Sequence, residues 1–470
     1  MNRPVAWAAS AVVVSLFTSG CGGARRPNVV VVVVDSLRAD ALGCYGGQPD
    51  VSPEIDRLCA EGLRFDRAVA QAPWNLPAIS SLVTSTYPWK NGRGMVEPKA
   101  GDVATLAETM AKEGYRTGAF TEAAWPLLQR GFASFENTVG ANVFGDPGSS
   151  SAAKTFAAAR AWIRNEDGAK RPFFVLIHTY EAHSWFLGKR AHRAWARKEL
   201  PTYRGKLAEW AVRDFSKPAG PQVIDALLAA GPEDVAYARA LYRGAVSEVD
   251  KEVGALMTAL KQSHLDDDTV LLVTSSNGEG FAPELKRVHH GGRLHDDLVH
   301  VPLLVRWPGH LTPGSAANLV QHLDVAPTVL DLAGIPRQPL FAGRSLLIDD
   351  AGVMGRLRGP QFVLRKLPGE PTAVAEDAMF RTLPSGKRAT ATAPQLVLYS
   401  DWITLIDAGD HTELYDLKAD PKQEKDVSEK YAGVARSLRE QLKRYASEAG
   451  SAAAPDSAAM ERMRSLGYVQ

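Results

Sequence analysis

The sequence predicts an α/β fold built on a mostly parallel sheet. Three uninterrupted apolar runs, at 29–34, 173–177 and 270–274, have the pattern of strands buried on both faces. Segments with a helical spacing of apolar residues lie between them. A chain of 470 residues, 45% of them hydrophobic, can bury one large domain and a smaller one.

The first predicted strand, 29–34, runs directly into Asp35 and Ser36. Ligands of open α/β sheets bind beyond the carboxyl ends of the strands, so Asp35 stands where chemistry usually occurs. A strand-end aspartate also serves commonly as a cap or turn residue. For this strand taken alone, both interpretations stay open.

Two more predicted strands end in polar groups. The strand at 173–177 leads into His178 and then His183, and the strand at 270–274 leads into the polar segment 275–279. His178 alone is typical of a hydrogen-bonded core histidine, whereas His183 lies in a polar, aromatic loop and is the better functional candidate. Three strands that end in this way favour one shared pocket.

The remaining elements follow from apolar spacing and from Pro and Gly breaks. The expected helices are 52–63, 77–84, 103–113 and 431–447, and the expected short strands are 115–120 and 395–405. Segments 191–206 and 223–260 are expected to be mainly helical, with breaks at 218–221 and 231–232. A helical insert at about 187–236 could form a lid or a partner surface. Its tryptophans fit core packing better than stacking on a sugar ring; they are Trp185, Trp195 and Trp210.

The net charge of +1 gives no electrostatic reason to expect a nucleic-acid partner. A basic cluster runs from Lys189 to Lys198. It has two interpretations, a solvated helix face or an entrance for an anionic substrate.

The N-terminus has the pattern of a bacterial lipoprotein signal peptide at 1–21. Arg3 precedes an apolar segment that is too short to span a bilayer comfortably, and small residues lead to Cys21. Cys21 would be lipidated and anchor the protein to a membrane, although Thr18 replaces the usual aliphatic residue. A plain secretory signal and an uncleaved anchor are the alternatives, and all three place the folded part outside the cytoplasm.

Two further cysteines, Cys44 and Cys59, follow the signal. Outside the cytoplasm they can form a disulfide, and two buried thiols are an equal alternative. Neither belongs to a CxxC pattern, so no zinc site built on thiolates is expected.

A loop enters a helix within 72–85, with Pro77 in the first helical turn. The unpaired N–H groups and the positive dipole end of a helix N-terminus suit an anion such as sulfate or phosphate. Asn75 stands at this point, and as a favoured N-cap residue it also has a structural explanation.

Taken together, these motifs resemble the sulfatase family of the alkaline-phosphatase-like superfamily. The matching segments keep the family order over nearly the whole mature chain and are 27–46, 52–65, 72–85, 274–279, 290–309, 324–334, 343–346, 413–421 and 466–469. The resemblance implies a large mixed, mostly parallel sheet sandwiched by helices at 26–342. It also implies a small C-terminal subdomain with an antiparallel sheet at 343–470.

In that family a formylglycine, made from the first residue of a C/S-x-P-x-R pentapeptide, attacks a sulfate ester, and Lys and His residues assist. The resemblance places Asn75 at the nucleophile position and His183 and His290 among the catalytic residues. It assigns substrate binding to these two histidines and His178.

The family also binds calcium through carboxylate and amide oxygens, which grips the sulfate. Here the resemblance assigns the metal to Asp35 and Asn277, with Ser36 and Ser276 at two further ligand positions. Ser276 replaces a carboxylate, and Ser36 replaces an aspartate found in many members. Calcium is therefore expected to bind weakly, because affinity depends on the number of charged ligands.

The chain also departs from the family at the reactive centre. Asn75 has no nucleophile and cannot be converted to formylglycine by the known route, so formylglycine is expected to be absent. Ile79 replaces the arginine that anchors the aldehyde. The standard sulfatase mechanism is therefore not expected.

Two functions remain open. The first is an extracytoplasmic sulfuric ester hydrolase by descent, weakly active or inactive, with phosphate esters as a variant. The second is a non-catalytic binding or scaffold lipoprotein, a pseudoenzyme that keeps a pocket for sulfated or phosphorylated small molecules or glycans.

Overall fold

A computed structural model describes residues 26–91, 103–139, 151–165, 171–208, 219–349, 362–364, 372–377, 380–382, 388–390 and 395–449. The signal peptide with Cys21, the tryptophan at 210 and the motif at 466–469 lie outside these residues. Within the described part, no helix combines the length and apolar character needed to cross a membrane.

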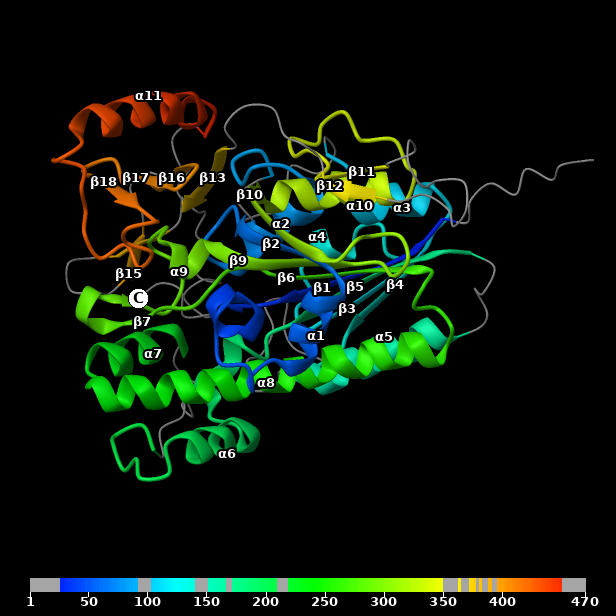
Figure 1. Ribbon diagram of the computed structural model, residues 1–470, viewed down its shortest axis with the longest axis horizontal. Coiled ribbons are helices and arrows are strands. Elements are labelled where there is room, and N and C mark those ends of the chain that lie inside the picture. Colours follow the sequence, from blue (N-terminus) through cyan, green and yellow to red (C-terminus); the bar gives the residue numbers. More distant parts are fainter. Residues whose placement is uncertain are drawn as a thin grey trace, which may run out of the picture.

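An eight-stranded sheet forms the centre of the molecule, with the order β10-β2-β9-β6-β1-β5-β3-β4 (Figure 1). Its strands are β1 (Asn28–Val34), β2 (Leu63–Val69), β3 (Arg116–Thr121), β4 (Ser134–Asn137), β5 (Phe173–Thr179), β6 (Thr269–Ser275), β9 (His300–Arg306) and β10 (Gly314–Gln321). Strand β9 runs antiparallel to both of its neighbours, and the other adjacent pairs are parallel. The expected mixed, mostly parallel sheet is confirmed.

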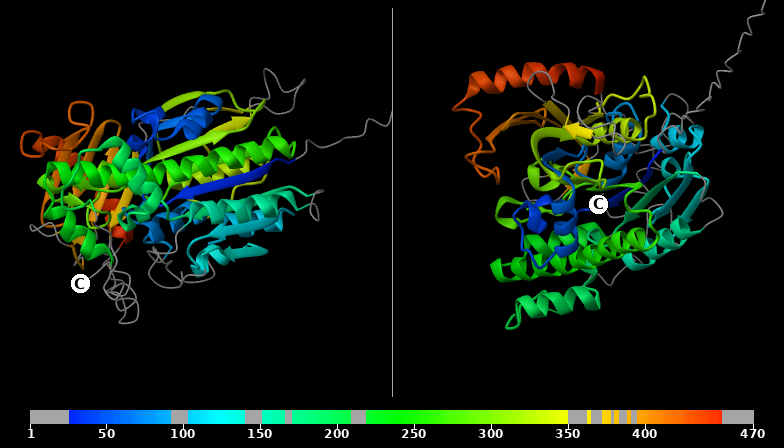
Figure 2. Two further views of the ribbon diagram at one scale, coloured as in Figure 1. Left: turned by 90° about the horizontal axis from the view of Figure 1, so that it is seen from below. Right: turned by 45° about the vertical axis from the view of Figure 1, so that its right-hand side comes forward.

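Helices cover both faces of this sheet, as Figures 1 and 2 show. They are α1 (Pro53–Glu61), α2 (Asn75–Thr84), α3 (Leu106–Lys112), α4 (Pro126–Gln129), α5 (Ala152–Arg164), α6 (Arg190–Glu199), α7 (Ala219–Leu228), α8 (Pro232–Gln262), α9 (Asp296–Val299) and α10 (Val325–Leu332). The long α8 lies along one face and packs against α1, α5 and α6.

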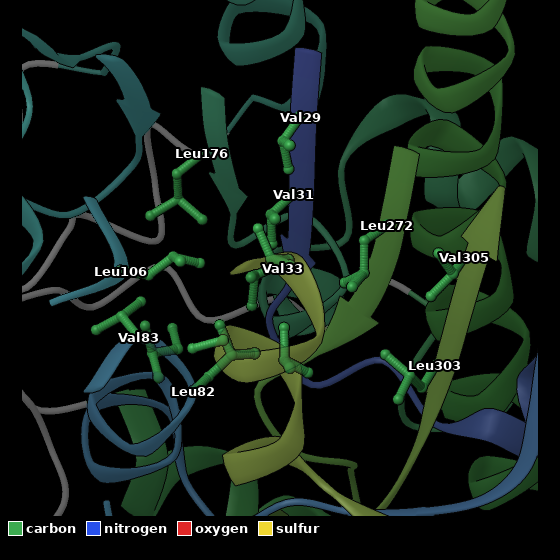
Figure 3. Packing of buried hydrophobic residues seen from close by; sticks show 14 of the residues in the cluster. Val29, Val31, Val33, Leu82, Val83, Leu106, Leu176, Leu272, Leu303 and Val305 are labelled. Atoms are coloured by element: carbon green, nitrogen blue, oxygen red, sulfur yellow. The ribbon is translucent and has the colours of Figure 1, made fainter. Parts of the chain in front are cut away.

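Strand β1 explains why the sheet needs helices on both sides. Its side chains alternate, because successive residues of a strand point to opposite faces. Val29, Val31 and Val33 belong to a core shared with α2, α3 and α10 (Figure 3), whereas the alternate valines pack with α1, α5 and α8. A run of six buried valines is therefore the expected sequence of a central strand.

The C-terminal part forms a separate four-stranded antiparallel sheet in the order β13-β16-β17-β18. Its strands are β13 (Thr372–Asp377), β16 (Gln395–Ser400), β17 (Ile403–Asp407) and β18 (Thr412–Asp416), and α11 (Ala432–Ala449) covers one face. The other face packs against the main domain through Val397 and Tyr399. The subdomain has the expected architecture, and its boundary at 342/343 stays a prediction.

Short antiparallel pairs complete the described structure. They are β7 (Phe281–Ala282) with β8 (Arg287–Val288), β11 (Leu347–Asp349) with β12 (Phe362–Leu364), and β14 (Phe380–Thr382) with β15 (Arg388–Thr390).

The predicted helix at 191–206 is too long, because α6 ends at Glu199. Pro201 explains this end, since the residue before a proline avoids the helical conformation.

Cys44 and Cys59 form a disulfide, which decides between the two alternatives of a disulfide and two buried thiols.

Candidate functional site

The three strands that end in polar residues are neighbours in the sheet. Strand β1 lies between β5 and β6, with Val33 opposite His178 and Val34 opposite Ser275. Their carboxyl ends therefore meet at one edge, where Asp35 is fully buried. His178 Nε2 lies 3.6 Å from Asp35 Oδ1.

The N-terminus of α2 approaches the same carboxylate. Asn75 Nδ2 donates to Asp35 Oδ2 at 2.9 Å and to the Tyr180 hydroxyl at 3.3 Å. Of the two interpretations of Asn75, the structure does not support the N-cap: Asn75 is the first residue of the helix and follows Trp74 at the cap position. Its side chain bridges Asp35 and the first turn of the helix, because Nδ2 donates to Asp35 while Oδ1 accepts from the Leu76 N–H at 2.7 Å.

The loop after β6 supplies the other contacts. Ser276 Oγ donates to Asp35 Oδ1 and also lies 2.8 Å from Asn277 Oδ1. Asn277 Nδ2 donates to Ser36 Oγ at 3.2 Å. Ser36 itself has a φ of 59°, a left-handed conformation that is uncommon for residues other than glycine. These contacts bring the five predicted positions from β1, β6 and α2 into one buried cluster.

This cluster fits a tightly held calcium ion poorly. It contains one carboxylate, and both oxygens of Asp35 already accept hydrogen bonds from Asn75 and Ser276. Calcium takes six to eight oxygen ligands, and its affinity rises with the charge of the ligand set. Asn277 and the two serines add only neutral oxygens.

Burial and neighbouring charges act in opposite directions on these groups. Burial raises the pKa of Asp35, but contacts with His178 and the charges of His178 and His183 outweigh it, so the pKa is lowered. Burial, and then the charge of His290, lower the pKa of His183 to about 4. At neutral pH the site therefore contains an ionised Asp35 and a neutral His183.

A second buried cluster adjoins the first. His289 Nδ1 and His290 Nδ1 each lie 3.2 Å from a different oxygen of the Glu279 carboxylate. The ring of His290 lies 4.9 Å from that of His183, measured between centroids. Burial would raise the pKa of Glu279, but the charges of the two histidines lower it well below its ordinary value. Within the described residues these three form a group that could hold a metal ion.

Sequence reasoning identified His290 but missed Glu279 and His289 as site residues. Two signals were present: Glu279 is the last residue of the predicted polar segment, and two histidines stand side by side at 289–290. The hairpin of β7 and β8 returns the chain, and His289 with a φ of 58° completes the turn. This pairing could not be inferred from spacing alone.

The basic cluster is only partly a solvated face. His192 is fully buried, and its Nε2 lies 2.9 Å from Glu181 Oε1, to which Lys189 Nζ also pairs at 2.7 Å. Trp185 is buried in the core beneath the insert, as expected. The exposed residues of α6, such as Lys198, keep the solvated interpretation.

Comparison with known proteins relates this geometry to a family. The sequence model of the family described as "Sulfatase" matches residues 27–335. Arylsulfatase A of Homo sapiens is 26% identical over 477 residues, covering 90% of this chain and 88% of that protein.

Two solved structures are similar over nearly their whole length. A protein in complex with its substrate D-glucosamine-2-N,6-O-disulfate has a TM-score of 0.66 at 19% identity, covering 90% of this chain and 98% of that one. The phosphonate monoester hydrolase of Agrobacterium radiobacter has a TM-score of 0.65 at 21% identity, covering 90% and 96%. At these identities the likeness shows a shared fold.

Proposed function

The chain belongs to the sulfatase family, whose model matches residues 27–335, and we propose that it binds sulfated or phosphorylated ligands without the formylglycine reaction. It is a sulfuric ester hydrolase by descent, with weak turnover or none. The observation that carries this proposal is the contact of Asn75, the residue at the nucleophile position: its side-chain amide donates a hydrogen bond to Asp35.

The two serines that follow Asn75 on α2 are poorly placed to replace the nucleophile. Ser80 Oγ donates to the Leu76 carbonyl at 2.7 Å within α2, and Ser81 Oγ accepts a hydrogen bond from Asn91. Both serines lie further along the helix than Asn75, and both are buried. Ile79 is part of the hydrophobic core, so the family's anchoring charge is missing as well.

Features that suit an oxyanion remain. The N-terminus of α2 carries a partial positive charge and N–H groups. Neither ring nitrogen of His178 forms a hydrogen bond, and Nδ1 of the buried His183 also has none. With His290, these side chains form a set of imidazole donors for a sulfate or phosphate group.

A sulfated glycan or a smaller sulfate ester is the ligand class that best fits this set. The solved relative with a disulfated glucosamine binds such a sugar, and the similar phosphonate monoester hydrolase extends the chemistry to phosphorus oxyanions. We extend both ligand classes to this chain as part of the proposal.

We further propose that the protein works outside the cytoplasm, held to a membrane by a lipidated Cys21. The Cys44–Cys59 disulfide supports this, because disulfides persist mainly in oxidising compartments. Expression in a bacterium with lipoprotein processing tests it. The wild type should fractionate with membranes and Cys21→Ser with the soluble fraction, and equal fractionation contradicts the anchor.

The binding proposal is tested by calorimetry with a sulfated disaccharide and by a sensitive aryl sulfatase assay on the same preparation. We expect binding without turnover. Binding should be at least about 10-fold weaker in His183→Ala and in His178→Ala, because each substitution removes a hydrogen-bond donor to a charged sulfate or phosphate, and such a bond is worth more than about 1 kcal/mol. His411→Ala, at an exposed histidine, is the control that should bind normally.

Calcium-dependent turnover that is lost in Asp35→Ala would instead establish a working hydrolase. An absence of any binding to sulfated or phosphorylated probes would reject the binding role.

A further inference from the structure

Glu279, His289 and His290 form a compact donor set that the sulfate-binding proposal does not use as a unit. All three side chains are buried, and their ligand atoms lie within 4.8 Å of one another. They come from one segment that leaves the end of β6, forms the β7–β8 hairpin and returns. The hairpin therefore holds two imidazoles against one carboxylate.

The distances between the nitrogen and oxygen atoms of this set suit a small metal ion in tetrahedral coordination. Each imidazole Nδ1 lies 3.2 Å from a carboxylate oxygen of Glu279. Two ligands bound to tetrahedral zinc at roughly 2.0–2.1 Å are separated by roughly 3.3 Å. An ion can thus replace the shared protons with little movement of the side chains.

The donor types select the metal. Two imidazoles and a carboxylate suit zinc and related divalent transition metals, whereas calcium prefers oxygen ligands alone. Because Cys44 and Cys59 are joined in a disulfide, neither can provide a thiolate. The set therefore differs in chemistry from the oxygen cluster around Asp35.

Another buried histidine stands beside the set. The His183 ring lies 4.9 Å from the His290 ring and 6.4 Å from the His289 ring, measured between centroids. His183 is 7% exposed, and its Nδ1 has no hydrogen-bond partner. A buried imidazole nitrogen without a partner is costly unless something binds it.

We propose that Glu279, His289 and His290 bind one divalent transition metal ion, with zinc the best fit. His183 lies outside this donor set and keeps its role in the oxyanion proposal. The site takes a cation where the Asp35 cluster lacks the charge to do so. This proposal does not depend on whether the protein binds sulfated ligands.

Metal content tests the proposal directly. Untagged full-length protein is stripped with a chelator, incubated with zinc in the presence of excess calcium, desalted and analysed by mass spectrometry of the metal. The wild type should retain one zinc per chain. Glu279→Gln, which keeps the side-chain shape, and His289→Ala should each weaken zinc binding by at least about 10-fold.

Cobalt substitution gives a second readout. A four-coordinate site of imidazole and carboxylate donors should give intense visible d–d bands, which Glu279→Gln removes. The matched control is His295→Gln, a buried histidine paired with Glu413 outside the set, which should leave the zinc content and the bands unchanged.

Circular dichroism and thermal melting identify variants that fail to fold. If His289→Ala fails to fold, the isosteric Glu279→Gln supplies the result. The proposal is overturned if the folded wild type retains no zinc, if Glu279→Gln retains as much as the wild type, or if cobalt gives only the weak bands of six-coordinate ions.

Discussion

At the residue scale, the environment of Asp35 depends on its two hydrogen-bond donors. Asn75 and Ser276 each satisfy one carboxylate oxygen, so a single negative charge is stable in a fully buried position. A second carboxylate in this place would repel the first unless a cation lay between them. Ser276 therefore explains why Asp35 is stable in this buried position, and it adds no charge that would attract a calcium ion.

Ser276→Asp tests this argument. The substitution adds the second charge, so we expect calcium affinity to rise at least about 10-fold, because affinity follows ligand charge. Without calcium the melting temperature should fall, and calcium should restore it. Calorimetry and thermal melting measure the two effects. Ser276→Asn, which has the same shape and no charge, should show neither, and equal calcium affinity in the two variants would contradict the role of charge.

The site could be predicted from sequence where each residue follows a buried strand. Asp35, His178 and Ser276 each stand at or just beyond the end of an apolar run, and parallel pairing brings those ends together. Glu279 and His289 could not be paired in this way, because their contact depends on a hairpin and on a left-handed His289.

At the element scale, helix α1 is capped by a residue from another helix. Asp250 on α8 accepts hydrogen bonds from the N–H groups of Ile55 at 2.7 Å and Glu54 at 3.2 Å. Burial raises the pKa of Asp250 to about 6, and nearby Glu54 adds to the increase. Sequence could predict α1 from its spacing, but not this cap, which comes from 195 residues away.

This cap gives a prediction for pH. A carboxyl whose pKa is higher in the folded state than the ordinary 3.8 stabilises the fold below pH 3.8, and that contribution is lost as the pH rises through about 6. The unfolding free energy of the wild type relative to Asp250→Asn should therefore fall by about 1–3 kcal/mol between pH 4 and pH 6. Urea denaturation across this range measures it. Asp225→Asn on α7 is the control, and a constant difference between wild type and Asp250→Asn would contradict the raised pKa.

The disulfide joins the loop after β1 to the C-terminal half of α1. It closes a loop with a sequence separation of 15 residues. Such a loop is worth about 3 kcal/mol through the unfolded chain. We expect the double variant Cys44→Ser with Cys59→Ser to lose about 2–4 kcal/mol of unfolding free energy, measured by denaturation. Reductant should destabilise the wild type by a similar amount and leave the variant unchanged. Equal stability of oxidised and reduced wild type would show that the bond contributes nothing.

At the scale of the whole molecule, two sheets share one interface. Tyr399 and Val397 of the antiparallel sheet pack with Leu294, Leu298 and other residues of the main domain in one buried cluster. The apolar runs predicted the parallel sheet, whereas the antiparallel sheet was expected from the resemblance to the sulfatase family and from the short-strand region at 395–405. The sequence could not predict how the two sheets meet, since the contacting residues lie about 100 positions apart.

One partly buried hydrogen bond tests how firmly the antiparallel sheet is joined to the main domain. The Tyr399 hydroxyl donates to Asp296 Oδ1 at 2.7 Å, and burial raises the pKa of Asp296. Tyr399→Phe leaves that carboxyl with one donor fewer, so the unfolding free energy should fall by about 1–3 kcal/mol. Urea denaturation and limited proteolysis measure the loss, with Tyr431→Phe at an exposed position as the neutral control. Because the interface also buries apolar side chains, unfolding should remain a single transition; two separate transitions in the wild type would show that the sheets fold independently.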